Sequence, residues 1–132
     1  MTMKKNKIIL ILALFVILIL CVSAKVEKKI TVTDIPRQYI GKYAFLALST
    51  IKNNDVVALT MPSKVIRSDS ITMSFIDAKS FKPYTANGTF MFMMSITETD
   101  DTKSKDLYTG ASLSIKISKE ETTISFDDLM KL

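Results

Sequence analysis

The sequence predicts an all-β protein, a single antiparallel sandwich or small barrel of about eight short strands, preceded by an N-terminal hydrophobic helix that acts as a signal. Three observations lead to this prediction. A long apolar stretch follows a lysine-bearing start. Hydrophobic residues in the remainder alternate with a period of two, and turn-forming residues separate the alternating segments.

The N-terminal segment has the layout of a secretory signal peptide. Three lysines precede an apolar run over residues 8–22, and small residues close it at Ala24. We therefore expect cleavage after Ala24, which divides the chain into a signal peptide over residues 1–24 and a β domain over residues 25–132. The signal predicts an exported protein that is periplasmic, displayed on the cell surface or secreted.

Two other fates of this segment stay open. Cys21, the only cysteine, could carry a lipid, although the preceding Leu20 is larger than the small residue that usually stands there. The segment could also remain as an uncleaved anchor, although its apolar run is shorter than the ~20 residues that span a bilayer comfortably. Each alternative also places residues 25–132 outside the cytoplasm, attached to a membrane through the N-terminal segment alone.

Four segments alternate apolar and polar residues, as half-buried strands do: 30–33, 71–77, 112–118 and 122–126. The clearest is 112–118, in which Leu113, Ile115 and Ile117 should face the core while Lys116 faces solvent. The tail, residues 127–132, fits either a helical turn or an extension of the last strand.

Other segments are apolar on both faces. Residues 43–48 and 90–94 are continuous apolar runs, and residues 56–61 are nearly so. Runs of this length are typical of central strands that are covered on both sides. Turn-forming residues flank them, most clearly Asn87-Gly88, which suits the positive φ of a tight hairpin turn.

Composition excludes most familiar catalytic sets. The chain has no histidine, and its single cysteine lies in the predicted signal, so Ser-His-Asp triads, Cys-His pairs and His or Cys zinc sites have no residues to build them. Much of the net charge of +5 comes from the leader lysines, and no basic run interleaved with aromatic residues suggests nucleic-acid binding. We expect no enzyme activity, cofactor, metal site or nucleic-acid partner.

The residues best suited to a contact surface are three tyrosines and two methionines: Tyr39, Tyr84, Tyr108, Met91 and Met93. Tyrosine suits sites that are apolar at one end and wet at the other, and methionine adapts to irregular partners. Alternation over residues 90–97 places Met91 and Met93 on the face opposite Phe92. Packing within the core is the structural alternative for all five residues, and thioether binding of Cu(I) is a further one for the methionines.

Several stretches together resemble small exported, lipoprotein-like β-rich proteins of treponemes. They are the sequence ITVTDIP at 30–36 with Tyr39 and the GKYA that follows, GTF at 88–90, and TTISF at 122–126 with the LMKL ending. The resemblance implies a domain of the cell envelope and supplies no catalytic residues.

The sequence thus predicts a noncatalytic exported β domain of the cell envelope or exterior, with a binding or structural role and an unidentified protein or envelope partner. The alternative is a carrier of a small hydrophobic ligand, with an apolar pocket between the strands lined by Phe and Met.

Overall fold

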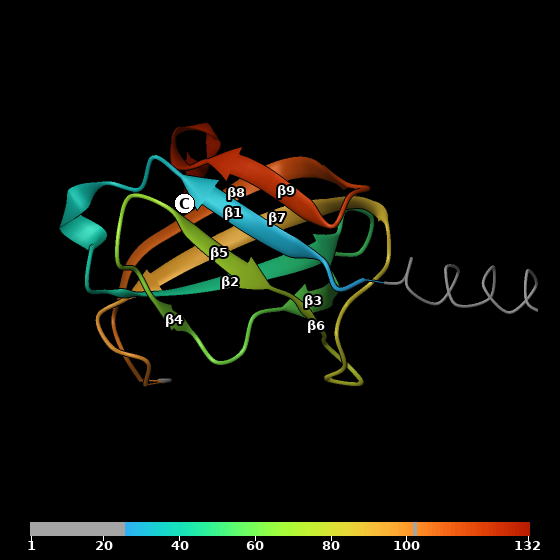
Figure 1. The fold of residues 1–132 in the computed structure, drawn as a ribbon, viewed down its shortest axis with the longest axis horizontal. Coiled ribbons are helices and arrows are strands. Elements are labelled where there is room, and N and C mark those ends of the chain that lie inside the picture. The colour runs from blue at the N-terminus through green and yellow to red at the C-terminus, as the bar shows by residue number, and fades with distance from the viewer. Residues whose placement is uncertain (1–25, 102) are drawn as a thin grey trace, which may run out of the picture.

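The computed structural model describes residues 26–101 and 103–132 (Figure 1). The predicted signal peptide, the cleavage position at Ala24 and Cys21 lie outside the described residues. The described chain forms ten strands and two short 3-10 helices. In chain order these are β1 (Lys29–Thr33), η1 (Arg37–Tyr39), β2 (Tyr43–Thr50), β3 (Val56–Leu59), β4 (Lys64–Val65), β5 (Ile71–Ser74), β6 (Ile76–Asp77), β7 (Gly88–Thr97), β8 (Asp106–Ile117), β9 (Glu121–Ser125), η2 (Phe126–Asp128) and β10 (Met130–Lys131). No helix within the described ranges combines the length and the apolar character that a membrane crossing requires.

The strands form two sheets that pack as a sandwich and do not close into a barrel. The smaller sheet has the order β5-β1-β9, and the seven-stranded sheet has the order β10-β8-β7-β2-β3-β6, with β4 also paired to β2 (Figure 1). The prediction of an all-β fold is confirmed, and of its two forms the structure adopts the sandwich.

The antiparallel prediction is wrong at one pair, because β1 and β9 run parallel. These are the first and last strands of the smaller sheet along the chain. The chain forms β9 beside β1 only after it has formed β7 and β8 in the seven-stranded sheet. Parallel neighbours need such a long connection, whereas a tight hairpin always joins antiparallel strands. The strand count is also higher than predicted, since β4, β6 and β10 have two residues each and are too short to show alternation.

The segment predicted as one strand over residues 71–77 belongs to both sheets. Ile71–Ser74 pairs with β1, whereas Ile76–Asp77 pairs with β3. The change occurs at Phe75, whose side chain is fully buried and whose amide donates to the Lys28 carbonyl at 2.9 Å. The chain thereby turns a corner of the sandwich, as strands do when they switch sheets.

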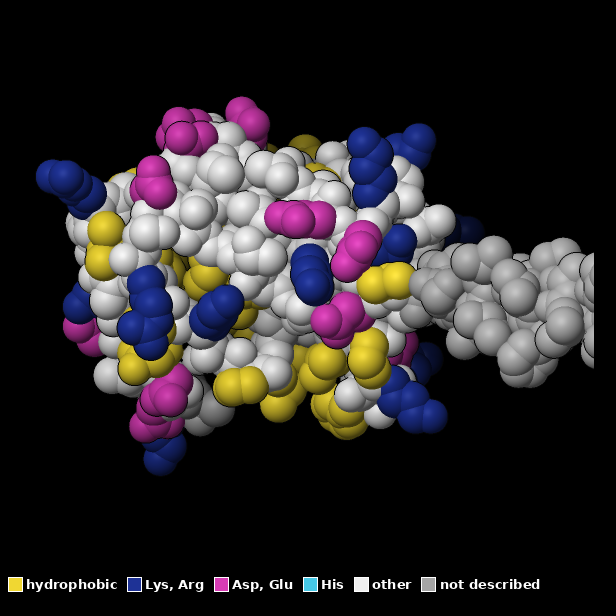
Figure 2. Space-filling view, viewed as in Figure 1, with side chains coloured by type: hydrophobic (Ala, Val, Ile, Leu, Met, Phe, Trp, Pro, Cys, Tyr) yellow, Lys and Arg dark blue, Asp and Glu magenta, His cyan; other side chains and the backbone are white. Residues whose placement is uncertain are grey.

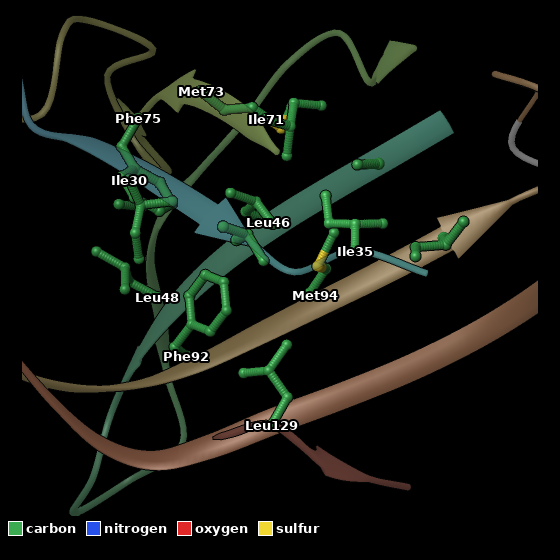
Figure 3. Close-up of a cluster of buried hydrophobic side chains, with 14 of the residues drawn as sticks. Ile30, Ile35, Leu46, Leu48, Ile71, Met73, Phe75, Phe92, Met94 and Leu129 are labelled. Carbon is green, nitrogen blue, oxygen red and sulfur yellow. The ribbon is translucent and has the colours of Figure 1, made fainter. Parts of the chain in front are cut away.

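The core lies between the two sheets. Ile30 and Val32 of β1 face Leu46 and Leu48 of β2 together with Phe92 and Met94 of β7, and all six side chains are fully buried (Figure 3). In β7 every second residue from Phe90 to Ile96 is buried, so the predicted division of this strand into two faces is confirmed, with the Phe92 face inward. Ile71 and Met73 of β5 complete the cover from the smaller sheet.

The predicted alternation in residues 112–118 fails at Leu113. A register shift makes Leu113 and Ser114 of β8 oppose the single residue Met91 of β7, which is a β-bulge. Because of the extra residue, odd-numbered residues of β8 point inward after the bulge and even-numbered residues point inward immediately before it. Ile117 is therefore buried and Ile115 packs against the core, while Leu113 is 64% exposed.

The tail combines both conformations left open by the sequence. Ser125 caps the short helix η2, accepting a hydrogen bond from the Asp127 amide at 3.3 Å, and β10 follows as a two-residue strand on β8. The Ser125 hydroxyl also donates to the Asp34 carboxylate at 2.7 Å, which ties the end of β9 to the end of β1.

Thr60 bridges a gap along the edge of β2. β3 pairs with β2 from Ala47 onward and β4 pairs with it at Tyr43 and Ala44, so Leu46 lies between the two partners. There the Leu46 amide donates to the Thr60 hydroxyl at 2.9 Å, and the Thr60 amide donates to the Leu46 carbonyl at 3.0 Å. Thr60 and Leu46 are almost completely buried, so water does not reach the backbone amide and carbonyl of Leu46, and Thr60 supplies their hydrogen-bond partners instead.

The substitution Thr60→Val tests this bridge. Valine keeps the shape of threonine but leaves the buried Leu46 amide without its acceptor, which should lower the free energy of unfolding by about 1–3 kcal/mol. Urea titration followed by circular dichroism measures the change, with the exposed Thr89→Val as the matched control at about 0.5 kcal/mol or less. Equal stability of the two variants would show that water reaches the Leu46 amide.

Candidate interaction surface

The seven-stranded sheet carries a continuous apolar row on the face that points away from the core. Cross-strand register places one residue from each of six adjacent strands in this row, which runs Met130, Ala111, Met93, Ala47, Leu59 and Ile76. Residues directly opposite each other in a sheet share a face, so the row crosses the sheet from β10 to β6. We call it the Met93 row.

Larger side chains shield smaller ones within the row. Ala47 and Ala111 are buried although they point outward, because Met93 stands between them and Leu59 and Met130 flank them. Met130 is 51% exposed. The row therefore has low points at the two alanines and high points at the methionines.

The positions beside the row are uncharged. Phe45 and Met91 lie on the same face two residues from Ala47 and Met93, and both are partly exposed. Ser49, Ser95 and Thr109 are the neighbouring polar residues. We call the whole outward surface of β2, β7 and β8, together with the Met93 row, the outer face.

The outer face corrects one prediction from the sequence. Residues 43–48 and 90–94 do form the central strands β2 and β7, but the smaller sheet covers only one of their two faces. Every other strand of the described chain lies within one of the two sheets, so no third layer of strands formed by residues 26–101 and 103–132 covers the outer face. The core therefore accounts for the apolar residues on the inward face of these strands but not for those on the outward face.

The smaller sheet has a contrasting polar surface. Thr31 donates to Glu121 and shares a hydrogen bond of 2.7 Å with Thr72, so one polar row crosses β9, β1 and β5. Figure 2 looks onto this side of the molecule and shows scattered charged side chains over it, with hydrophobic side chains mainly along its lower side and at its left end. Only the seven-stranded sheet is apolar on both faces.

Two of the three predicted contact tyrosines come together. The rings of Tyr39 and Tyr108 lie 5.9 Å apart between centroids, and Phe126 packs against both at 6.0 and 4.5 Å. Tyr84 lies elsewhere, with its ring 6.1 Å from Phe90 in an edge-to-face arrangement.

Tyr84 and Tyr108 are not surface residues. They are 7% and 6% exposed and belong to the core cluster, so their prediction as contact residues is wrong. Each fills the end of the sandwich, where an aromatic ring can close the core while its hydroxyl approaches solvent. Gly110 makes room for Tyr108, because a Cβ at this position would stand 2.0 Å from the Tyr108 hydroxyl. Tyr39 remains partly exposed, as do Met91 and Met93.

Three of the surface hollows among the described residues bear on the site, and they lie outside the outer face or at its margin. One of about 640 Å³ is lined by Asp55, Asp77, Lys79 and Tyr84 among others. Asp77 accepts hydrogen bonds from the amides of Lys79 and Ser80, both at 2.9 Å, and these bonds lower the pKa of its carboxyl group. This carboxylate is thus used to fix a turn.

The other two hollows differ in their lining. One of about 350 Å³ adjoins the Tyr39 cluster. The other, of about 510 Å³, borders the outer face between Phe45, Met61 and the acidic loop that precedes β8. Among the described residues no three His, Cys, Asp or Glu side chains approach closely enough to hold a metal ion.

Sequence reasoning named Met93, together with the adjacent Met91, but missed the other members of the row. Ala47, Leu59, Ile76, Ala111 and Met130 come from strands far apart in sequence, so only the strand register brings them together. The available signal was the two-sided apolarity of residues 43–48 and 90–94.

Comparisons with protein-family models, with curated proteins and with solved structures find no match to this chain. The assignment of a function therefore depends on the surfaces described above.

The buried tyrosines predict an alkaline loss of stability. Burial raises the pKa of the Tyr84 and Tyr108 hydroxyls above the ordinary value, with smaller contributions from Asp77 and Tyr39 respectively. A raised pKa in the folded state favours the neutral phenol, so its contribution to stability is complete below about pH 10 and is lost as pH rises through the folded-state pKa.

Denaturant titrations at several alkaline pH values measure this loss. Tyr108→Phe has no hydroxyl to ionise at this position and should lose less stability than the parent protein between pH 9 and about pH 11. An equal alkaline loss in both proteins would show that Tyr108 ionises as readily in the folded chain as in the unfolded one.

Proposed function

We propose that this chain is a noncatalytic β domain, exported to the cell envelope or secreted, that acts by binding through the outer face of its seven-stranded sheet. The single observation that supports this proposal is the Met93 row, an unbroken apolar line across six strands with no layer above it in the described chain. Contiguous apolar patches of this kind mark interaction sites, because leaving them in water is unfavourable by about 25 cal/mol per Å².

The noncatalytic part of the proposal depends on chemistry. Proton transfer near neutral pH is most often the work of histidine, and the chain has none. After removal of the predicted signal no thiol nucleophile remains. We therefore propose no reaction, no cofactor and no nucleic-acid partner.

Geometry favours a binding domain over a hydrophobic-ligand carrier. A carrier would hold its ligand between the strands, where Leu46, Leu48 and Phe92 are fully buried against the smaller sheet. The described hollows instead lie at the surface and have mixed linings, as in the hollow between Asp77 and Tyr84.

Export is part of the same proposal and is supported by the leader sequence. If the signal is cleaved as expected, N-terminal sequencing of the protein recovered outside the cytoplasm should begin at Lys25. A protein that begins at Met1 would contradict cleavage and favour the retained anchor. Recovery of the folded protein only from the cytoplasm would contradict export itself.

Site-specific photocrosslinking in the producing cell tests the binding face. A photoreactive amino acid in place of Met93 should give covalent adducts, because the proposed partner lies against this position. The matched control is Thr123, an exposed residue of β9 on the polar side of the sandwich, where we expect no adduct. Equal labelling at the two positions, or none at Met93, would contradict binding through the outer face.

A further inference from the structure

We infer that the outer face binds a second copy of the same chain, with the two seven-stranded sheets packed face to face about a twofold axis that lies along the Met93 row. This inference rests on the proposed function and names its partner. Three properties of the face support it: its size, the distribution of charge along β8, and the depth of the Met93 row.

The outer face has nearly the area of a stable interface. Each strand residue covers about 3.3 Å along the strand and about 4.8 Å across the sheet, so the residues of these six strands, most of them in β2, β7 and β8, cover about 600 Å² in flat projection. The relief of the side chains increases the accessible area further. A standard interface buries about 800 Å² on each partner, so one copy of this face against another is of the right size.

The charges at the two ends of β8 are complementary under a twofold rotation. Asp106 pairs across the sheet with Thr97, and Lys116 pairs with Thr89, so both charged residues lie on the outward side. Both are exposed, and neither makes an ion pair or a side-chain hydrogen bond within the described part of the chain.

Ala111, a member of the Met93 row, lies midway between Asp106 and Lys116 in the sequence. A twofold axis along the row therefore places β8 of one copy over β8 of the other, with the two strands running in opposite directions. This rotation brings Asp106 of one copy above Lys116 of the other, and the reverse, with the uncharged surface between them. Such complementarity at the rim of an interface mainly fixes the relative orientation of the partners.

The depth of the row suits close packing of two sheets. Stacked sheets lie about 10 Å apart and cross at about 30°. The proposed axis places each member of the row over its own copy, and the flexible Met93 side chains can bend into the space above the buried Ala47 and Ala111 on either side. Because the opposite surface of each sandwich is polar, the association closes at two copies.

Sedimentation-equilibrium measurements on the protein purified from the compartment in which it accumulates test the inference. We expect a reversible monomer–dimer equilibrium. Met93→Glu should weaken the dimer by about a hundredfold or more, because two buried, unpaired carboxylates would meet at the axis. Thr123→Glu adds the same charge on the polar side and should leave the equilibrium unchanged. Thermal unfolding of the variants at a concentration where all are monomeric verifies that each is folded.

Charge reversal tests the orientation of the two copies. Asp106→Lys and Lys116→Asp should each weaken the dimer by about tenfold, because each creates two like-charge contacts, and the double variant should regain the parent affinity. Recovery of affinity would not occur if these residues were remote from each other in the dimer. Additive weakening in the double variant would overturn the proposed axis.

The outcomes separate this inference from the proposed function. A protein that stays monomeric at the highest accessible concentration, and yet gives adducts to a different protein or to lipid at Met93, overturns self-association and keeps binding through the outer face. A monomer without any adduct at Met93 overturns both. A dimer that Met93→Glu leaves intact places the self-association on another surface and overturns the inference.

Discussion

The packing of β1 against the middle of the seven-stranded sheet is the interaction on which the rest of the structure depends. β1 is hydrogen-bonded on both sides, to β5 and to β9, and its Ile30 and Val32 are fully buried. Burial of each such side chain contributes about 1.5–3 kcal/mol. No disulfide within the chain can substitute for this packing, because Cys21 is the only cysteine. The first and last long strands meet here, so the sandwich requires nearly the whole described chain before it is complete.

The same arrangement leaves the two sheets unequal. Strands of four or five residues make up the smaller sheet, whereas β7 and β8 have ten and twelve. The smaller sheet can bury only one face of the larger sheet. The outward face of the smaller sheet is polar, with side-chain hydrogen bonds that join Thr31 to Thr72 and to Glu121. An apolar second face on the larger sheet is then unnecessary for the fold of one chain. Its presence at Met93 and Leu59 is the observation behind the proposed partner.

The sequence was sufficient to predict whatever depends on neighbours within one strand. Period-two alternation correctly placed Phe92 and Met94 on one face of β7 and Met93 on the other, although it did not show which face is inward. It failed at Leu113, because a bulge is a property of two paired strands, and at the β1–β9 pair, because parallel pairing depends on the path of the intervening chain. For the same reason the sequence left open whether Tyr84 and Tyr108 pack in the core or contact a partner. An aromatic residue near a strand end has the same local sequence signal whether it closes the core or faces a partner.

The edges of the two sheets are less suited than the outer face to the proposed association. At β5 the Lys64 ammonium donates to the Thr72 carbonyl at 2.9 Å, which occupies a backbone group that an added strand would need. β10 covers β8 only at Gly110 and Ala111, but beyond them the bulge at Leu113 distorts the strand and Lys116 places a charge beside it. Bulges and lysines at edges oppose the addition of further strands. The outer face has neither device near its centre, so the apolar surface there is the part of the described molecule that is left open to a partner.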